Sequence, residues 1–123
     1  MQQRVLCALA VAVCLTVLAA TAFAQADTAQ ISGFVKDPTG AVVPNANVSV
    51  RNEATSLERR ATSNEAGYYV ASGLPPGYYT VSVEATGFKK FVKTQNKLDP
   101  NINTTVDVAL DVGQLTETVE VVA

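Results

Sequence analysis

The chain alternates apolar and polar positions in short runs, and glycine or proline separates one run from the next. A period of two places every second side chain on the same face of a β-strand, while glycine and proline mark the tight turns between strands. The first run carries Ile31, Gly33 and Val35 on one face, and an Asp-Pro-Thr-Gly turn at residues 37–40 ends it. We therefore predict a protein built from short strands and tight turns.

The later runs repeat this pattern and define the expected core. Residues 57–63 are polar and predict a solvent-exposed edge strand, and residues 89–94 predict a short outer strand. Leu74 is expected to close one end of the core, and the Pro-Pro-Gly turn after it allows Gly77 a positive φ. Together the runs predict an all-β fold, a seven-stranded antiparallel β-sandwich of Greek-key type. The side chains expected to face inward are Ala46, Val48, Val50, Tyr69, Ala71, Tyr79, Val81, Val83, Ala85, Ile102, Thr104, Val106, Val108 and Leu110.

The first residues have the organisation of a secretory signal. Arg4 supplies a basic start, residues 5–20 form an apolar run, and residues 22–24 form a small-x-small cleavage site. We therefore predict that a signal peptide is cleaved and that the chain is exported. Because Cys7 and Cys14 both lie in the signal, the exported part has no cysteine with which to form a disulfide. The expected organisation is a signal peptide at 1–24, a leader at 25–28, a β-sandwich at 29–111, and a linker with a tail at 112–123.

Composition and charge exclude several classes of function. The chain has a formal net charge of −2 and no histidine. An acidic balance of this kind argues against a nucleic-acid partner. The chain has no histidine, and no cysteine follows the signal, so the usual nucleophilic residues and zinc ligands are absent. We therefore expect no catalytic residues, no cofactor and no metal. The clustered basic residues are interpreted as the solvated rim of a strand: Lys89, Lys90, Lys93 and Lys97.

Two pairs of carboxylates remain as weaker candidates for chemistry. Asp107 and Asp111 lie four residues apart on a predicted strand, where both face water, so they are interpreted as strand surface and not as a glycosidase pair. Asp37 and Asp99 are somewhat better placed as calcium ligands, although lone acidic residues in turns usually accept hydrogen bonds from backbone amides.

A set of glycine, apolar and tyrosine positions recurs at fixed spacing: Gly33, Val35, Asp37, Gly40, Ala46, Val48, Gly67, Tyr69, Leu74, Pro75, Gly77, Tyr79, Val81, Val83, Gly87 and Phe88. This pattern resembles the carboxypeptidase regulatory-like domain, a transthyretin-like (prealbumin-like) or carbohydrate-binding-like sandwich. The resemblance covers nearly all of the chain after the signal. It implies a fold more firmly than a function, because this sandwich serves many unrelated proteins.

The tail resembles a second known element, the TonB box of outer-membrane receptors. It consists of Glu117, Thr118, Val119, Glu120, Val121, Val122 and Ala123. In Oar-like and SusC-like receptors such a box follows a regulatory-like sandwich on the periplasmic side of the outer membrane. The resemblance therefore implies that location, the TonB C-terminal domain as the partner, and β-strand addition as the mode of binding. The plug and the transmembrane barrel of such receptors are missing here, so we expect either the N-terminal extension of a transporter or a self-contained periplasmic module.

Carbohydrate binding is the alternative function. Tyr68 and Tyr78 are predicted to point outward, whereas Tyr69 and Tyr79 point inward. Sugars stack on exposed aromatic rings, so the two outward tyrosines would form a platform if their strands were neighbours. The same residues are also explained as amphipathic side chains that half-cover the rim of the sandwich.

Overall fold

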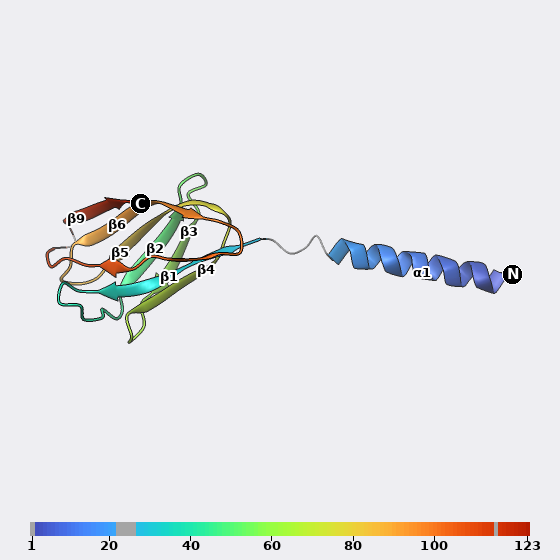
Figure 1. Ribbon diagram of the computed structural model, residues 1–123, viewed down its shortest axis with the longest axis horizontal. Helices are drawn as coiled ribbons and strands as arrows, with labels where there is room; N and C mark the ends of the chain where they lie inside the picture. The colour runs from blue at the N-terminus through green and yellow to red at the C-terminus, as the bar shows by residue number, and fades with distance from the viewer. Residues whose placement is uncertain (1, 22–26, 115) are drawn as a thin grey trace.

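The computed structural model describes residues 2–21, 27–114 and 116–123, with one helix followed by an all-β domain (Figure 1). Two sheets pack face to face around one apolar core, which confirms the predicted β-sandwich. The elements are α1 (Gln2–Thr21), β1 (Ala29–Lys36), β2 (Asn47–Asn52), β3 (Glu58–Thr62), β4 (Tyr68–Leu74), β5 (Gly77–Glu84), β6 (Lys90–Leu98), β7 (Asn103–Thr105), β8 (Val108–Ala109) and β9 (Thr118–Val122).

The two sheets differ from the prediction in strand count and direction. One has the order β4-β1-β7, with β8 also pairing β1, and the other has the order β3-β2-β5-β6-β9. The described residues thus form nine strands instead of seven. The sheets are also not wholly antiparallel, because β7 and β8 run parallel to β1, and β9 runs parallel to β6.

The predicted last strand is split into β7 and β8 for a local reason. The Asp107 carboxylate oxygen Oδ1 accepts a hydrogen bond from the Phe34 amide at 3.0 Å, in place of a backbone carbonyl. Next to it the Val106 carbonyl lies so close to Gly33 that a Cβ on that glycine would come within 2.0 Å of the carbonyl oxygen. Ile102, predicted to face inward, is 51% exposed because it precedes β7 and lies outside the sandwich core.

The other inward-facing positions form the core largely as predicted. Ile31, Val35, Val50, Val81 and Val83 are fully buried, and Tyr69 and Tyr79 are the largest buried side chains. Burial raises the pKa of the Tyr69 hydroxyl, which donates a hydrogen bond of 2.5 Å to the Val106 carbonyl. The core therefore includes a neutral tyrosine whose hydrogen bond connects β4, on one side of β1, to the segment between β7 and β8 on the other side.

The strand predicted at residues 89–94 is longer and more central than expected. β6 continues to Leu98 and lies between β5 and β9. A β-bulge interrupts its pairing with β5, and Gln95 takes a positive φ of 59° there. The buried Asn96 amide donates to the carbonyls of Tyr79 and Lys93, so a polar side chain replaces ladder hydrogen bonds and lets the strand continue.

The turn after β1 has the predicted geometry. The Asp37 carboxylate accepts hydrogen bonds from the Thr39 hydroxyl, the Thr39 amide and the Ala41 amide, and Gly40 has a φ of 85°. The Thr39 hydroxyl contributes most to holding the pKa of Asp37 below its usual value. Asp37 is thus explained by its turn, and β3 is the exposed edge strand that the polar segment predicted.

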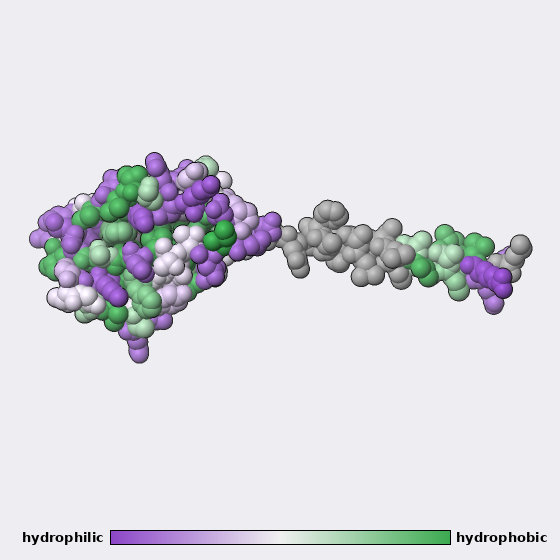
Figure 2. All heavy atoms as spheres, viewed as in Figure 1, coloured by the Kyte–Doolittle hydropathy of each residue, from purple (hydrophilic) through white to green (hydrophobic). Residues whose placement is uncertain are grey.

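Apolar side chains line α1 over residues 5–13, after a polar start at residues 2–4 (Figure 2). Val5, Leu6 and Leu9 are each more than half exposed, so they do not pack on the sandwich. No helix among the described residues is both long enough and apolar enough to cross a membrane. The predicted cleavage site at residues 22–24 lies outside the described residues.

Candidate functional site

The tail that resembles a TonB box is a strand at one edge of the larger sheet. β9 pairs with β6 in parallel register, with Lys90 opposite Thr118 and Thr94 opposite Val122. The Lys90 amide donates to the Glu117 carbonyl at 2.8 Å, and the Ala123 amide donates to the Thr94 carbonyl at 3.0 Å. The tail is therefore paired with β6 along the whole of β9.

The segment that leads into β9 is anchored as well. The Lys89 amide donates to the Asp111 carbonyl, the Gly113 amide donates to the Gly87 carbonyl, and the Lys89 ammonium lies 3.2 Å from Glu117 Oε2. The lysine side chain covers Gly113, where an added Cβ would come within 2.5 Å of Lys89 Cγ. No local pattern predicts the contact between Gly113 and Lys89, because it depends on β6 and β9 being neighbours.

The side chains of β9 remain largely in water. Val121 is 40% exposed, Val122 is 63% exposed, and only Val119 is half-buried, beside Phe91. Backbone hydrogen bonds therefore hold this strand more than apolar burial does. Its outer side has no neighbouring strand in the part of the chain that the structure describes.

The structure does not bring Tyr68 and Tyr78 together. Tyr68 lies on β4 and Tyr78 on β5, and these strands belong to different sheets. The Tyr68 ring instead contacts Phe34, with 5.1 Å between ring centroids, and Lys36 lies over the Phe34 ring at 5.8 Å. The platform of two tyrosines therefore does not exist, because its condition of neighbouring strands is not met.

Tyr78 lines a separate hollow of about 780 Å³ beside the Pro-Pro-Gly turn. The hollow combines exposed apolar groups with polar groups: Tyr78 is 53% exposed, Leu57 is 67% exposed, and Glu53 and Gln95 contribute oxygen and nitrogen atoms. Glu53 Oε1 also accepts a hydrogen bond from the Gln95 amide at 3.2 Å. Sequence reasoning missed Leu57 and Gln95, although an exposed leucine in a polar segment was a signal for the first.

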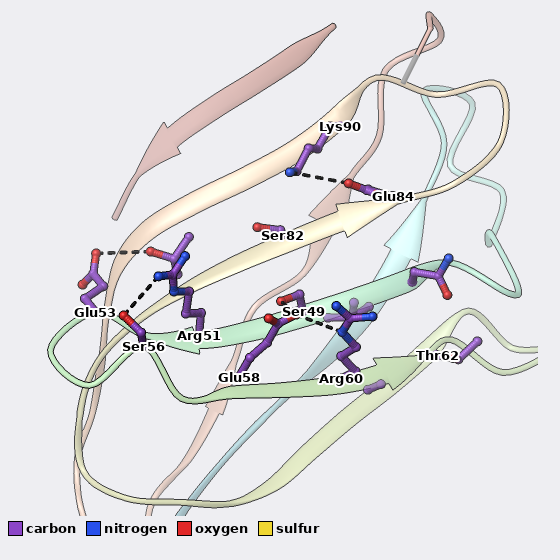
Figure 3. Close-up of a pocket in the computed structure, with 14 residues that line it drawn as sticks. Ser49, Arg51, Glu53, Ser56, Glu58, Arg60, Thr62, Ser82, Glu84 and Lys90 are labelled. Carbon is purple, nitrogen blue, oxygen red and sulfur yellow. Dashed lines mark hydrogen bonds and ion pairs between the residues drawn. The ribbon is translucent and has the colours of Figure 1, made fainter. Parts of the chain in front are cut away.

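A second hollow, of about 790 Å³, lies over the outer face of β2, β3 and β5 (Figure 3). Its charged groups bond to their neighbours: Glu58 accepts hydrogen bonds from Ser49 and Arg60, and Lys90 lies 3.5 Å from Glu84. The hydrogen bond from Ser49, followed by that from Arg60, lowers the pKa of the Glu58 carboxyl. Since acids and bases balance and already have partners, this face has the chemistry of a solvated sheet surface.

The remaining candidates of the sequence are separated or explained. Asp37 follows the end of β1. Asp99 lies near the start of β1, because the Asn101 amide donates a hydrogen bond to the Thr28 carbonyl. Asp37 and Asp99 are therefore at opposite ends of β1 and do not form a calcium site. No cluster of three acidic or cysteine ligands suited to a metal occurs among the described residues. Three of the four clustered lysines between residues 89 and 97 form ion pairs: Lys89 with Glu117, Lys90 with Glu84 and Lys97 with Asp99.

Two packed sheets that present an open strand edge and an end hollow define the chain after α1 as a β-sandwich module. Residues 30–111 match the carboxypeptidase regulatory-like domain. The match covers most of the chain, and the chain therefore belongs to this family. No curated protein sequence shows a significant match.

Solved structures share the fold at low sequence identity. A proposed carbohydrate-binding protein from Bacteroides uniformis is 20% identical, with a TM-score of 0.55 over 67% of this chain and 40% of that one. The Bacillus anthracis TIE protein is 16% identical, with a TM-score of 0.60 over 70% of this chain and 17% of that one. Hydroxyquinol 1,2-dioxygenase from Pseudomonas putida is 10% identical, with a TM-score of 0.56 over 72% and 58%. This chain thus spans less than two thirds of each of them, and the likeness concerns the fold alone.

Proposed function

We propose that this chain is the non-catalytic N-terminal extension of a TonB-dependent outer-membrane receptor, exported to the periplasm. In this proposal residues 117–123 bind the C-terminal domain of TonB by β-strand addition. The order of the features supports it: an apolar segment with a basic start, then a carboxypeptidase regulatory-like sandwich, then the box-like tail.

One observation carries the proposal. The segment that resembles the TonB box has the extended conformation that strand addition requires, and it lies at a sheet edge with Val121 and Val122 exposed. A strand that is already extended has lost part of its conformational entropy, so a partner strand binds it at a smaller entropic cost. The tail is therefore suited to backbone-directed binding by another β-sheet.

Titration calorimetry of the full chain against the purified TonB C-terminal domain tests this function. We expect binding by the full chain and its loss in a chain that ends at Thr116, because that truncation removes every backbone group of β9. Tyr78→Ala serves as the matched control, since Tyr78 lies outside the edge formed by β9 and should leave the affinity unchanged. Equal affinity of the full and truncated chains would contradict the proposal.

A second function, carbohydrate binding, is favoured by the hollow around Tyr78. An exposed ring beside carboxylate and amide groups offers a sugar both a stacking face and hydrogen-bonding partners. The fold shared with a proposed carbohydrate-binding protein supports this reading at the level of architecture. Tyr68 has the same ring, but that ring contacts Phe34 and lines neither of the two hollows.

Affinity electrophoresis in gels that contain soluble polysaccharides tests the sugar site. Retardation of the full chain should be lost in Tyr78→Ala and kept in Tyr68→Ala, which removes the same ring from the other sheet. Loss of retardation in Tyr68→Ala alone would place the sugar site on the Phe34 face. If no polysaccharide retards the full chain, carbohydrate binding is excluded for the sugars tested.

A further inference from the structure

The two sides of β9 present different backbone groups. In a parallel ladder, alternate residues of a strand bond to the neighbour on one side. The bonds from Lys90 to the Glu117 carbonyl and from Ala123 to the Thr94 carbonyl fix the phase of this ladder. The amides of Val119 and Val121 therefore face β6.

The outward-facing groups follow from the same phase. The amides and carbonyls of Thr118, Glu120 and Val122 point away from β6, toward the side where the described chain has no further strand. Three amides and three carbonyls in a row, on an extended and already ordered strand, form a template for one more strand.

We propose that the partner strand adds to this outer side of β9 while β9 stays on β6, so that the five-stranded sheet gains a sixth strand. The inference rests on the proposed function, because the occupant is a strand of the TonB C-terminal domain. It concerns how the tail is presented: the tail binds as part of the folded sheet and does not first detach from it.

The anchoring of β9 favours this mode over release of the tail. The hydrogen bonds of Lys89 to Asp111 and of Gly113 to Gly87, together with the ion pair between Lys89 and Glu117, fix the chain just before the strand. Detaching residues 117–123 would break the ion pair and the whole ladder with β6, whereas addition to the outer side breaks none of these contacts. The bound geometry is therefore already present in the free protein.

The opposite edge of the same sheet shows the contrast. β3 carries Glu58, Arg59 and Arg60 in succession, all exposed, and charged residues on an edge strand discourage pairing with other chains. β9 carries the exposed β-branched side chains of Val121 and Val122 at its end, and β-branched residues favour the extended conformation. The β9 edge is the one suited to accept a strand.

A reversible lock between β6 and β9 tests the inference. Lys93 and Val121 lie directly opposite each other, so Lys93→Cys with Val121→Cys can be joined by a disulfide, in a full chain that also carries Cys7→Ala and Cys14→Ala. We expect the oxidised, locked chain to bind the TonB C-terminal domain with the affinity of the reduced chain. Binding by the reduced form that is lost on oxidation would overturn the inference and leave the proposed function standing.

A pair of variants at Glu120 tests the outer side directly. Glu120→Pro removes an amide that faces away from β6, and an edge strand tolerates proline there. We expect its affinity to fall by about tenfold, the effect of one lost net hydrogen bond, while Glu120→Ala binds as the parent does. Unchanged affinity in Glu120→Pro would overturn the inference. Absence of binding in the unsubstituted chain would overturn the proposed function together with it.

Discussion

Two parallel pairings join the last part of the chain to earlier strands, and they differ in how they are held. In the core seam, β7 and β8 run along β1, and Val106, Val108 and Leu110 are at most 2% exposed. In the edge seam, β9 runs along β6, and Val121 and Val122 are 40% and 63% exposed. Both seams thus place valines beside a parallel partner strand, but the valines are buried in the core seam and exposed in the edge seam.

The core seam stabilises the fold, whereas the edge seam leaves its strand available to a partner. The core seam removes its valines from water, so its loss would cost most of the packing between the sheets. The edge seam buries little apolar area and relies on backbone bonds and one exposed ion pair, which contribute modestly. Substitutions of the same type in the two seams should therefore have unequal effects.

Glycine substitutions should separate the seams most strongly. In Gly33→Ala the new Cβ would lie 2.0 Å from the Val106 carbonyl oxygen, and because both groups are backbone, strands must move apart. We expect the free energy of unfolding to fall by about 3 kcal/mol. In Gly113→Ala the new Cβ meets only the flexible Lys89 side chain, so we expect a loss below about 1 kcal/mol.

Urea denaturation of both glycine variants, followed by circular dichroism, measures this difference. Equal losses in Gly33→Ala and Gly113→Ala would show that the close contact between β1 and Val106 does not control stability, and the distinction between the seams would fail.

Valine truncations should give a smaller contrast in the same direction. Val106→Ala removes two buried methyl groups and leaves a cavity, which we expect to cost about 2 kcal/mol of unfolding free energy. Val121→Ala removes the same groups from a side chain already 40% in water, and we expect a cost of at most about 0.5 kcal/mol. Thermal unfolding of the two variants under identical conditions provides the measurement, and the reverse order of midpoints would contradict the account.

Acid should have the smallest effect, at the turn that ends β1. The pKa of Asp37 is lower in the folded chain than its ordinary value of 3.8, so the ionised carboxylate stabilises the fold above pH 3.8. That contribution is lost as the pH falls through the folded pKa. Asp37→Ala should therefore unfold at a lower temperature than the parent at pH 7, and the difference should shrink below pH 3.8. A difference that grew on acidification would contradict this explanation of Asp37.

The sequence predicted the sandwich well because local rules determine most of it. Alternation identified Val48, Val50, Val81 and Val83 as core residues, and the residues of the turn identified the role of Asp37. Alternation failed where a residue's position depends on which strand lies beside it. No local pattern shows that Ile102 lies outside the core or that β9 runs parallel to β6. Tyr68 and Tyr78 were both correctly assigned outward positions, but only the topology shows that they lie on different sheets.

Amide hydrogen exchange of residues 117–123, measured by NMR with and without the TonB C-terminal domain, tests whether β9 stays on β6 when the partner binds. In the free chain the amides of Val119 and Val121 should be protected, and those of Thr118, Glu120 and Val122 should exchange rapidly. On binding, the second group should become protected while the first stays so. Loss of protection at Val119 and Val121 on binding would contradict the account, because it would show that the tail leaves β6 to reach its partner.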